Sequence, residues 1–196
     1  MNFVKNGNFA EKILSPWAPR SSDGAHPEPA DTDIITVDGF NLLRMSPGGL
    51  IHQDLDVNEM GGINAFTIKI KGAMVGQPRE LPENFSPVQS SANFPEMPDE
   101  KPRFKALSSD EPEPIGYLIF NARFVSGTVV EPPATDFMPF YSLRDFHDLE
   151  WTFVTTPNKQ WTHAFIYIWC RPYTSNDPKY LHSDVVITNI ELTEYR

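Results

Sequence analysis

The sequence predicts an all-β protein, an antiparallel β-sandwich of two sheets, and three observations support this. Segments rich in β-branched and aromatic residues recur along the chain and are bounded by Gly, Pro, Asn or Asp. No segment shows a sustained helical period with capping residues. The run from Trp161 to Arg171 alternates strictly between two kinds of side chain, as a strand does when its two faces have different surroundings.

The expected strands follow one another along the whole chain: Asn2–Lys5, Asp33–Val37, Phe40–Met45, Gly49–Val57, Ile63–Ala73, Gly116–Ser126, Leu149–Thr155, Gln160–Arg171 and Ser183–Tyr195. Asp38-Gly39 separates two apolar runs and predicts a tight hairpin turn. Two proline-rich stretches, Ser15–Thr32 and Gln77–Pro114, interrupt the pattern. Because proline cannot donate to a strand ladder, we expect Gln77–Pro114 to be a long inserted loop. With 196 residues, we expect one domain spanning 1–196.

Charge, cysteine content and the lack of long apolar runs restrict the classes of binding partner and the cellular compartment that we expect. The formal net charge of -10 disfavours nucleic acid and anionic membrane surfaces, and leaves neutral ligands, cations and basic proteins open. The single cysteine, Cys170, excludes an internal disulfide. The N-terminus lacks the pattern of a signal peptide, and no apolar run reaches membrane-spanning length. We therefore expect no membrane insertion, and a protein that is cytoplasmic or exported without a cleaved signal peptide.

Motifs for catalysis and metal binding are absent from the sequence. The five histidines share no close zinc-type spacing with one another or with Cys170: His26, His52, His147, His163 and His182. There is no Gly-x-Ser-x-Gly motif and no phosphate-binding glycine loop. We interpret Arg144-Asp145 and His147-Asp148 as a solvated loop, and Cys170 as a small buried hydrophobe. The sequence therefore predicts that the protein is not an enzyme.

The alternating run places two sets of side chains on opposite faces of one strand. Odd positions carry Trp161, His163, Phe165, Tyr167, Trp169 and Arg171, and even positions carry Thr162, Ala164, Ile166, Ile168 and Cys170. The even face suits a sandwich interior, and the aromatic row on the odd face suits a ligand. We expect Trp161, Tyr167 and Trp169 to stack on sugar rings, flanked by His163 and Arg171 as hydrogen-bond partners.

Tyr117, Asn121 and Arg123 also share one face of their predicted strand, and would add polar contacts if that face is the same one. Two other interpretations of the aromatic row remain open. The row can be buried beneath the Gln77–Pro114 loop, with three phenylalanines of that loop as its lid: Phe85, Phe94 and Phe104. It can also be a contact surface for another protein, where Trp, Tyr and Arg are enriched.

Segments at the two ends of the chain resemble segments of a known protein family. Asn2-Phe3-Val4-Lys5-Asn6-Gly7-Asn8-Phe9 followed by Trp17, and the closing Ser183–Glu194 segment, resemble the first and last strands of carbohydrate-binding modules with a jelly-roll fold. Phe40–Ser46 with Gly49–Leu55, and Trp151 with Phe153, are similar to inner segments of that galactose-binding-like group. The resemblance implies a jelly-roll sandwich whose concave face or rim loops bind sugars, with a structural calcium where the termini meet.

The sequence departs from that family at the calcium position. The acidic residue expected after the Asn-Gly-x-Phe turn is Ala10, with Glu11 one place late, and only Asp184 stands where the family often has two aspartates. Calcium needs several oxygen ligands at once, so these departures weaken the case for it and we expect no cofactor. We expect non-catalytic carbohydrate binding. The alternative is a structural or protein-interaction module, such as a subunit of a bacterial or phage surface assembly.

Overall fold

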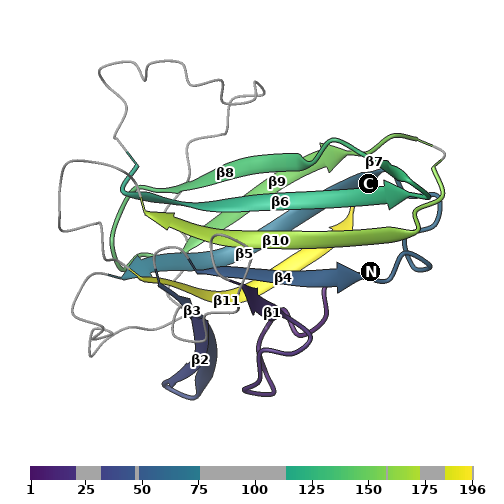
Figure 1. The fold of residues 1–196 in the computed structure, drawn as a ribbon. Coiled ribbons are helices and arrows are strands. Elements are labelled where there is room, and N and C mark those ends of the chain that lie inside the picture. The colour runs from purple at the N-terminus through teal and green to yellow at the C-terminus, as the bar shows by residue number, and fades with distance from the viewer. Residues whose placement is uncertain (21–31, 47–48, 76–113, 158, 173–183, 196) are drawn as a thin grey trace, which may run out of the picture.

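The computed structural model describes residues 1–196 except 21–31, 47–48, 76–113, 158, 173–183 and 196. Two antiparallel sheets face each other, and no helix occurs among the described residues (Figure 1). The six-stranded sheet contains β1 (Ala18–Arg20), β4 (Leu50–Leu55), β10 (His163–Pro172), β6 (Gly116–Ser126), β7 (Val129–Val130) and β8 (Ala134–Phe140). The five-stranded sheet contains β2 (Thr32–Val37), β3 (Phe40–Met45), β11 (Asp184–Glu194), β5 (Ala65–Val75) and β9 (His147–Val154). The predicted all-β antiparallel sandwich is confirmed.

Most strands lie where the sequence predicted them, and the exceptions are short or carry prolines. β3 and β6 coincide with their predicted ranges. The predicted strand Asn2–Lys5 forms only an isolated bridge, between Asn2 and Thr193. β1, β7 and β8 were not predicted. Apart from Pro114, which is buried, the predicted loop Gln77–Pro114 and its phenylalanines lie outside the described residues.

The Asp38-Gly39 turn connects β2 to β3, as predicted. Both turn residues have positive φ, 49° at Asp38 and 81° at Gly39. Those angles belong to the hairpin turn whose twist matches the twist of the strands on either side. The turn therefore sets the register of the β2–β3 pair, in which Val37 lies opposite Phe40.

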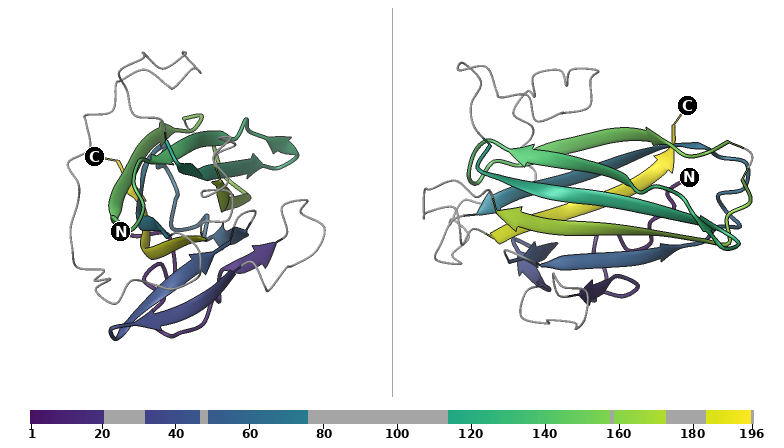
Figure 2. Two further views of the ribbon diagram at one scale, coloured as in Figure 1. Left: turned by 90° about the vertical axis from the view of Figure 1, so that its left-hand side faces the viewer. Right: turned by 45° about the horizontal axis from the view of Figure 1, so that its top comes forward.

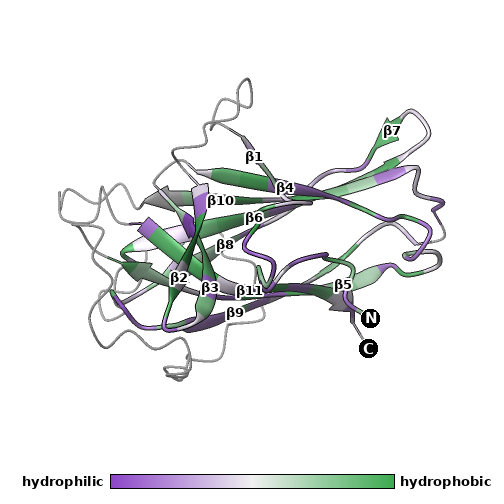
Figure 3. Cartoon of the chain, turned by 90° about the horizontal axis from the view of Figure 1, so that it is seen from below, coloured by the Kyte–Doolittle hydropathy of each residue, from purple (hydrophilic) through white to green (hydrophobic). Residues whose placement is uncertain are grey.

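Apolar side chains from both sheets form one core cluster between the two layers. Strands of both sheets are coloured as hydrophobic along much of their length (Figure 3). On β10 the even positions supply this layer, since Ala164, Ile166, Ile168 and Cys170 are all buried. Phenylalanine rings pack at its centre, with Phe66 stacked 5.6 Å from Phe124 and 5.6 Å from Phe153. The inward face of β10 is therefore committed to the core, and its outward face is left for other contacts.

The N-terminal segment joins the two sheets at one end of the sandwich, where the two chain ends lie side by side (Figure 2). Phe3 N–H donates to the Leu192 carbonyl of β11 at 2.8 Å. Lys5 exchanges two hydrogen bonds with the Gln53 side chain of β4, at 2.8 and 2.9 Å. The segment thus touches β11 in one sheet and β4 in the other.

Candidate functional site

β10 lies in the middle of the six-stranded sheet, paired with β4 on one side and β6 on the other. Tyr167 is registered opposite His52 of β4 and Asn121 of β6. Residues directly opposite one another in antiparallel strands point to the same face, so these side chains lie together on the face away from the core. We call this the outer face: the paired positions of the six-stranded sheet that share the side of Phe165, Tyr167 and Trp169.

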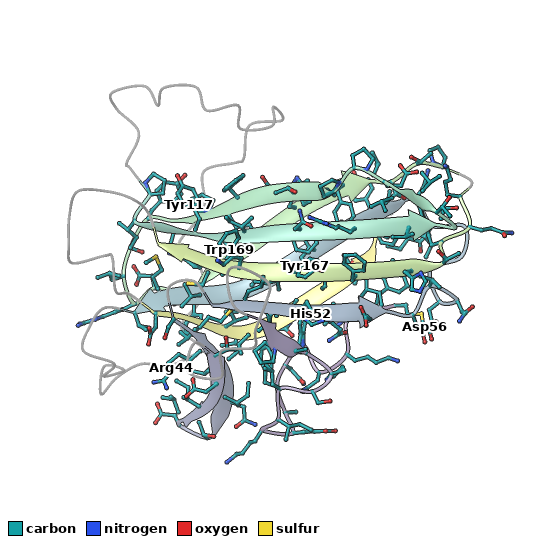
Figure 4. All side chains as sticks on the ribbon, in the orientation of Figure 1. Arg44, His52, Asp56, Tyr117, Tyr167 and Trp169 are labelled. Carbon is teal, nitrogen blue, oxygen red and sulfur yellow. The ribbon has the colours of Figure 1, made fainter. Side chains whose placement is uncertain are left out.

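An aromatic strip crosses the outer face. It consists of Tyr117 on β6, Trp169 and Tyr167 on β10, and His52 on β4, which lie in a diagonal line across three strands (Figure 4). All four side chains are partly exposed. The Tyr167 and His52 rings are stacked at 5.7 Å with an interplanar angle of 26°. Phe165 meets Tyr167 edge-on at 5.4 Å and extends the apolar surface along β10.

The backbone fixes the orientation of the His52 ring. Its Nδ1 lies 3.0 Å from the carbonyl oxygen of Ala18 on β1. A carbonyl oxygen only accepts hydrogen bonds, so Nδ1 carries the proton and donates it. The hydrogen bond therefore holds the His52 ring in its stacked position against Tyr167.

Polar groups border the strip on β6 and β8. Asn121 Nδ2 donates to Thr135 Oγ1 at 2.6 Å, and Arg123 Nε donates to Asn121 Oδ1 at 3.3 Å. Register places Asn121 opposite Tyr167, Arg123 opposite Phe165, and Tyr117 opposite Arg171. The three polar candidates on β6 therefore share the outer face with the β10 aromatics, which the sequence left open.

One predicted member of the aromatic row lies elsewhere. Trp161 is only 9% exposed and packs in the core, with its ring 5.1 Å from that of Phe124. β10 begins at His163, and at Thr162 both the N–H and the hydroxyl donate to the Val125 carbonyl. The chain is therefore not yet a regular strand at Trp161, and the strict alternation predicted for this residue does not apply. Trp161 is a core residue.

The two predicted polar partners on β10 lie at opposite ends of the strand. His163 is exposed, and its Nδ1 lies 3.3 Å from Thr162 Oγ1. Arg171 is placed on the outer face by its register opposite Tyr117, whereas its side chain lies outside the described residues. The structure thus brings Tyr167 and Trp169 together at the centre and leaves His163 at the rim.

The prediction of a solvated loop around His147 is wrong for His147 itself, which is buried in a strand. His147 begins β9 and is 3% exposed, although Arg144, Asp145 and Asp148 are exposed. Its Nε2 lies 3.2 Å from Ser142 Oγ. Burial lowers the pKa of His147, and the negative charges of Asp145 and Asp148 partly oppose this.

Cys170 and Asp184 lie on facing strands at one end of the core. Burial, and after it the nearby Asp184 carboxylate, raises the pKa of the Cys170 thiol to about 12. A thiol that stays protonated is a poor nucleophile, so Cys170 behaves as the buried hydrophobe that the sequence predicted.

The residues near the Asn6–Phe9 turn and Asp184 do not fit the calcium site that the sequence resemblance implies. The Asn6–Phe9 turn packs against Ile190, whereas Asp184 begins the same strand about 20 Å away. The Ala10 carbonyl accepts a hydrogen bond from Asn41 Nδ2 at 3.0 Å. Over the described ranges, no group of three or more His, Cys, Asp or Glu residues could hold a metal ion. In the same ranges, no helix is long and apolar enough to cross a membrane.

Two residues of the site were missed by the sequence analysis. His52 was considered only as a zinc ligand, and Phe165 was named in the aromatic row but not as a binding residue. His52 could have been found from the pattern around it, because Ile51 and Leu55 point inward and His52 therefore points outward. Its stacking on Tyr167 depends on the register of β4 and β10, which the sequence does not contain.

Comparison with known proteins extends the description of the fold. No family model matches the chain, and no curated protein matches it in sequence. Among solved structures, TmCBM61 in complex with beta-1,4-galactotriose aligns over 100% of this chain and 99% of its own, with a TM-score of 0.54 and 6% identity. The family 16 carbohydrate binding module-2 aligns over 98% of this chain and 100% of its own, with a TM-score of 0.54 and 12% identity. The chain has the jelly-roll fold of carbohydrate-binding modules.

The same jelly-roll architecture occurs within larger proteins. The enzymatically active domain of tailspike protein 4 from bacteriophage CBA120 aligns over 99% of this chain but 21% of its own length, with a TM-score of 0.55 and 10% identity. At such identities the likeness concerns the fold alone. The function has to be argued from the outer face.

Proposed function

We propose that this protein is a non-catalytic carbohydrate-binding module that binds a glycan on the outer face. One observation carries the proposal: the aromatic strip of Tyr117, Trp169, Tyr167 and His52 crosses three strands, and all four residues are partly exposed. Sugar rings have apolar faces that pack on indole and phenol rings, and their hydroxyls need polar partners beside those rings. Asn121 and Arg123 supply such partners along one side of the strip.

The dimensions of the strip favour an extended ligand over a single sugar. Neighbouring outward side chains are about 6–7 Å apart along a strand and about 5 Å apart between strands. From Tyr117 to His52 the strip spans three strands and several residues, so it can contact successive rings of an oligosaccharide. TmCBM61, which has the same fold, is described in complex with beta-1,4-galactotriose, and this supports an oligosaccharide ligand.

Removal of one ring tests the proposal. In Trp169→Ala, glycan affinity should fall at least about tenfold, because an aromatic contact of the strip is lost. Tyr167→Ala should also lower the glycan affinity, and it controls for misfolding that is specific to the Trp169→Ala variant. The matched control is Tyr195→Ala, which removes a ring that is 57% exposed and lies outside the strip. A glycan array identifies the ligand, and titration calorimetry with circular dichroism compares affinity and folding.

The opposite result would assign the outer face to another role. If both strip variants bind the array ligand as tightly as the wild type does, the strip is not the glycan site. If the wild type binds no glycan but its molecular mass rises with concentration, the outer face is a protein contact.

A further inference from the structure

Arg123 carries a positive charge on the outer face that the described residues do not neutralise. Arg123 Nε donates a hydrogen bond to Asn121 Oδ1 at 3.3 Å, and Asn121 Nδ2 in turn donates to Thr135 Oγ1 at 2.6 Å. Within the described part of the chain, Arg123 forms no ion pair and its side chain is exposed. The Asn121 contact fixes one edge of the guanidinium group and leaves the two Nη groups for a ligand.

Two cationic side chains of the five-stranded sheet have carboxylate partners. Arg44 Nε donates to Asp33 Oδ1 at 2.8 Å, and Lys69 Nζ lies 3.0 Å from Glu150. Both pairs join neighbouring strands of the five-stranded sheet. Arg123 also lies opposite a residue of a neighbouring strand, in the six-stranded sheet. That residue is Phe165 of β10, which carries no charge and cannot form an ion pair.

The outer face lacks the strong negative charge of the whole chain among the side chains that the structure describes. Among the outer-face strand positions whose side chains the structure describes, one is an arginine and one is a carboxylate: Arg123 and Asp54. The whole chain has a formal net charge of -10. Asp54 lies across β10 from Arg123, about 10 Å away, which is close to the screening length at physiological salt. Its repulsion of a carboxylate at Arg123 is therefore weak.

We propose that the glycan is acidic, and that Arg123 binds the carboxylate of a uronic acid residue while the sugar ring lies on Phe165 and Tyr167. This inference rests on the proposed function. A guanidinium group matches a carboxylate through two parallel hydrogen bonds, which are stronger than its bonds to neutral hydroxyls. Arg123 is then the residue that determines specificity, and the aromatic strip supplies affinity that does not depend on charge.

Matched ligand pairs test the inference. Polygalacturonate, alginate and glucuronoxylan are each compared with the same polymer after its carboxyl groups have been reduced to hydroxymethyl groups, using the full chain in affinity electrophoresis and calorimetry. We expect an acidic polymer to bind at least about tenfold more tightly than its reduced form, the range of a hydrogen-bonded charge. Arg123→Gln should abolish this preference, because it weakens binding of the acidic polymer far more than binding of the reduced polymer. Arg123→Lys should restore only part of the preference, because a lysine lacks the two-pronged geometry.

The controls separate this inference from the proposed function. Arg144→Gln makes the same substitution at an exposed arginine off the outer face and should bind like the wild type. If acidic and reduced polymers bind equally and Trp169→Ala weakens both, the acidic ligand is refuted and the glycan site stands. If Arg123→Gln weakens both members of a pair equally, Arg123 does not select for charge. If no acidic or neutral glycan binds, both proposals fail.

Discussion

Gly7 occupies a position where no other residue fits, at the point where the N-terminal segment crosses β11. A Cβ atom at Gly7 would lie 2.0 Å from the carbonyl oxygen of Ile190 and 3.3 Å from Val4 Cγ1. The Gly7 carbonyl also accepts a hydrogen bond from Ile190 N–H at 3.0 Å. Glycine is therefore required here for close approach of two backbones.

Gly7→Ala should destabilise the protein by about 1–3 kcal/mol, the usual cost of overpacking, because the backbone oxygen of Ile190 cannot move without disturbing β11. Chemical denaturation of wild type and variant measures the change. Gly61→Ala is the matched control, since the added Cβ would lie 3.8 Å from the Asn58 carbonyl oxygen, an ordinary contact, and Gly61 has no positive φ. Equal stability of the two variants would show that the segment can separate from β11 without cost.

Among the elements, long strands with apolar patterns were predictable, whereas the short strands β1 and β7 and the proline-containing strand β8 were not. β6 begins at Gly116, ends just before Gly127 and is rich in apolar and β-branched residues, so its range follows from its own residues. β8 contains Pro139 and follows Pro132 and Pro133, which argues against a strand. Among the described strands β8 pairs only with β6, so an edge position tolerates a residue that cannot donate.

In the candidate site too, features that follow from one strand's own residues were predictable, and features that depend on the pairing of strands were not. The alternation along β10 predicted that Tyr167 and Trp169 share an outward face, because a two-residue period is a local property. It failed at Trp161, because pairing of the strand begins only at His163. The neighbours from other strands, His52 above all, follow from register and not from the sequence of one strand.

β8 also carries a charged residue on its inward face, which natural edge strands use to discourage further pairing. Asp136 is 7% exposed, and burial raises the pKa of its carboxyl, partly offset by a hydrogen bond from Phe137 N–H at 2.9 Å. The folded protein thus holds this proton more tightly than the unfolded chain. The carboxylate therefore lowers stability progressively as the pH rises above its ordinary pKa of 3.8.

Asp136→Asn should raise the free energy of unfolding at neutral pH, because the amide needs no buried charge and its oxygen can still accept from Phe137. The gain should shrink as the pH falls toward 4, where the aspartic acid becomes protonated in both states. Urea denaturation between pH 4 and 7 measures it, with exposed Asp54→Asn as the control. A gain that is the same at every pH would mean that the charge of Asp136 is not its source.

For the molecule as a whole, the N-terminal segment joins the two sheets. Phe3, Val4 and Phe9 enter the core between the layers. Backbone bonds tie the segment to β11, and the Gln53 side chain ties it to β4. Gln53 is 1% exposed, so its amide meets the Lys5 backbone where little water can substitute. One buried side chain thus secures the segment to the sheet that carries the outer face.

Gln53→Met keeps a similar volume but removes both hydrogen bonds to Lys5. We expect a loss of about 1–3 kcal/mol in the free energy of unfolding, the net contribution of two hydrogen bonds. Hydrogen exchange should show faster exchange at Lys5 N–H, while Phe3 N–H stays protected by Leu192. Gln160→Met, the same change at an exposed glutamine, should leave stability within about 0.5 kcal/mol of the wild type. If Phe3 loses protection along with Lys5, the segment is released from both sheets as one unit, and Gln53 fastens the whole N-terminus and not only its contact with β4.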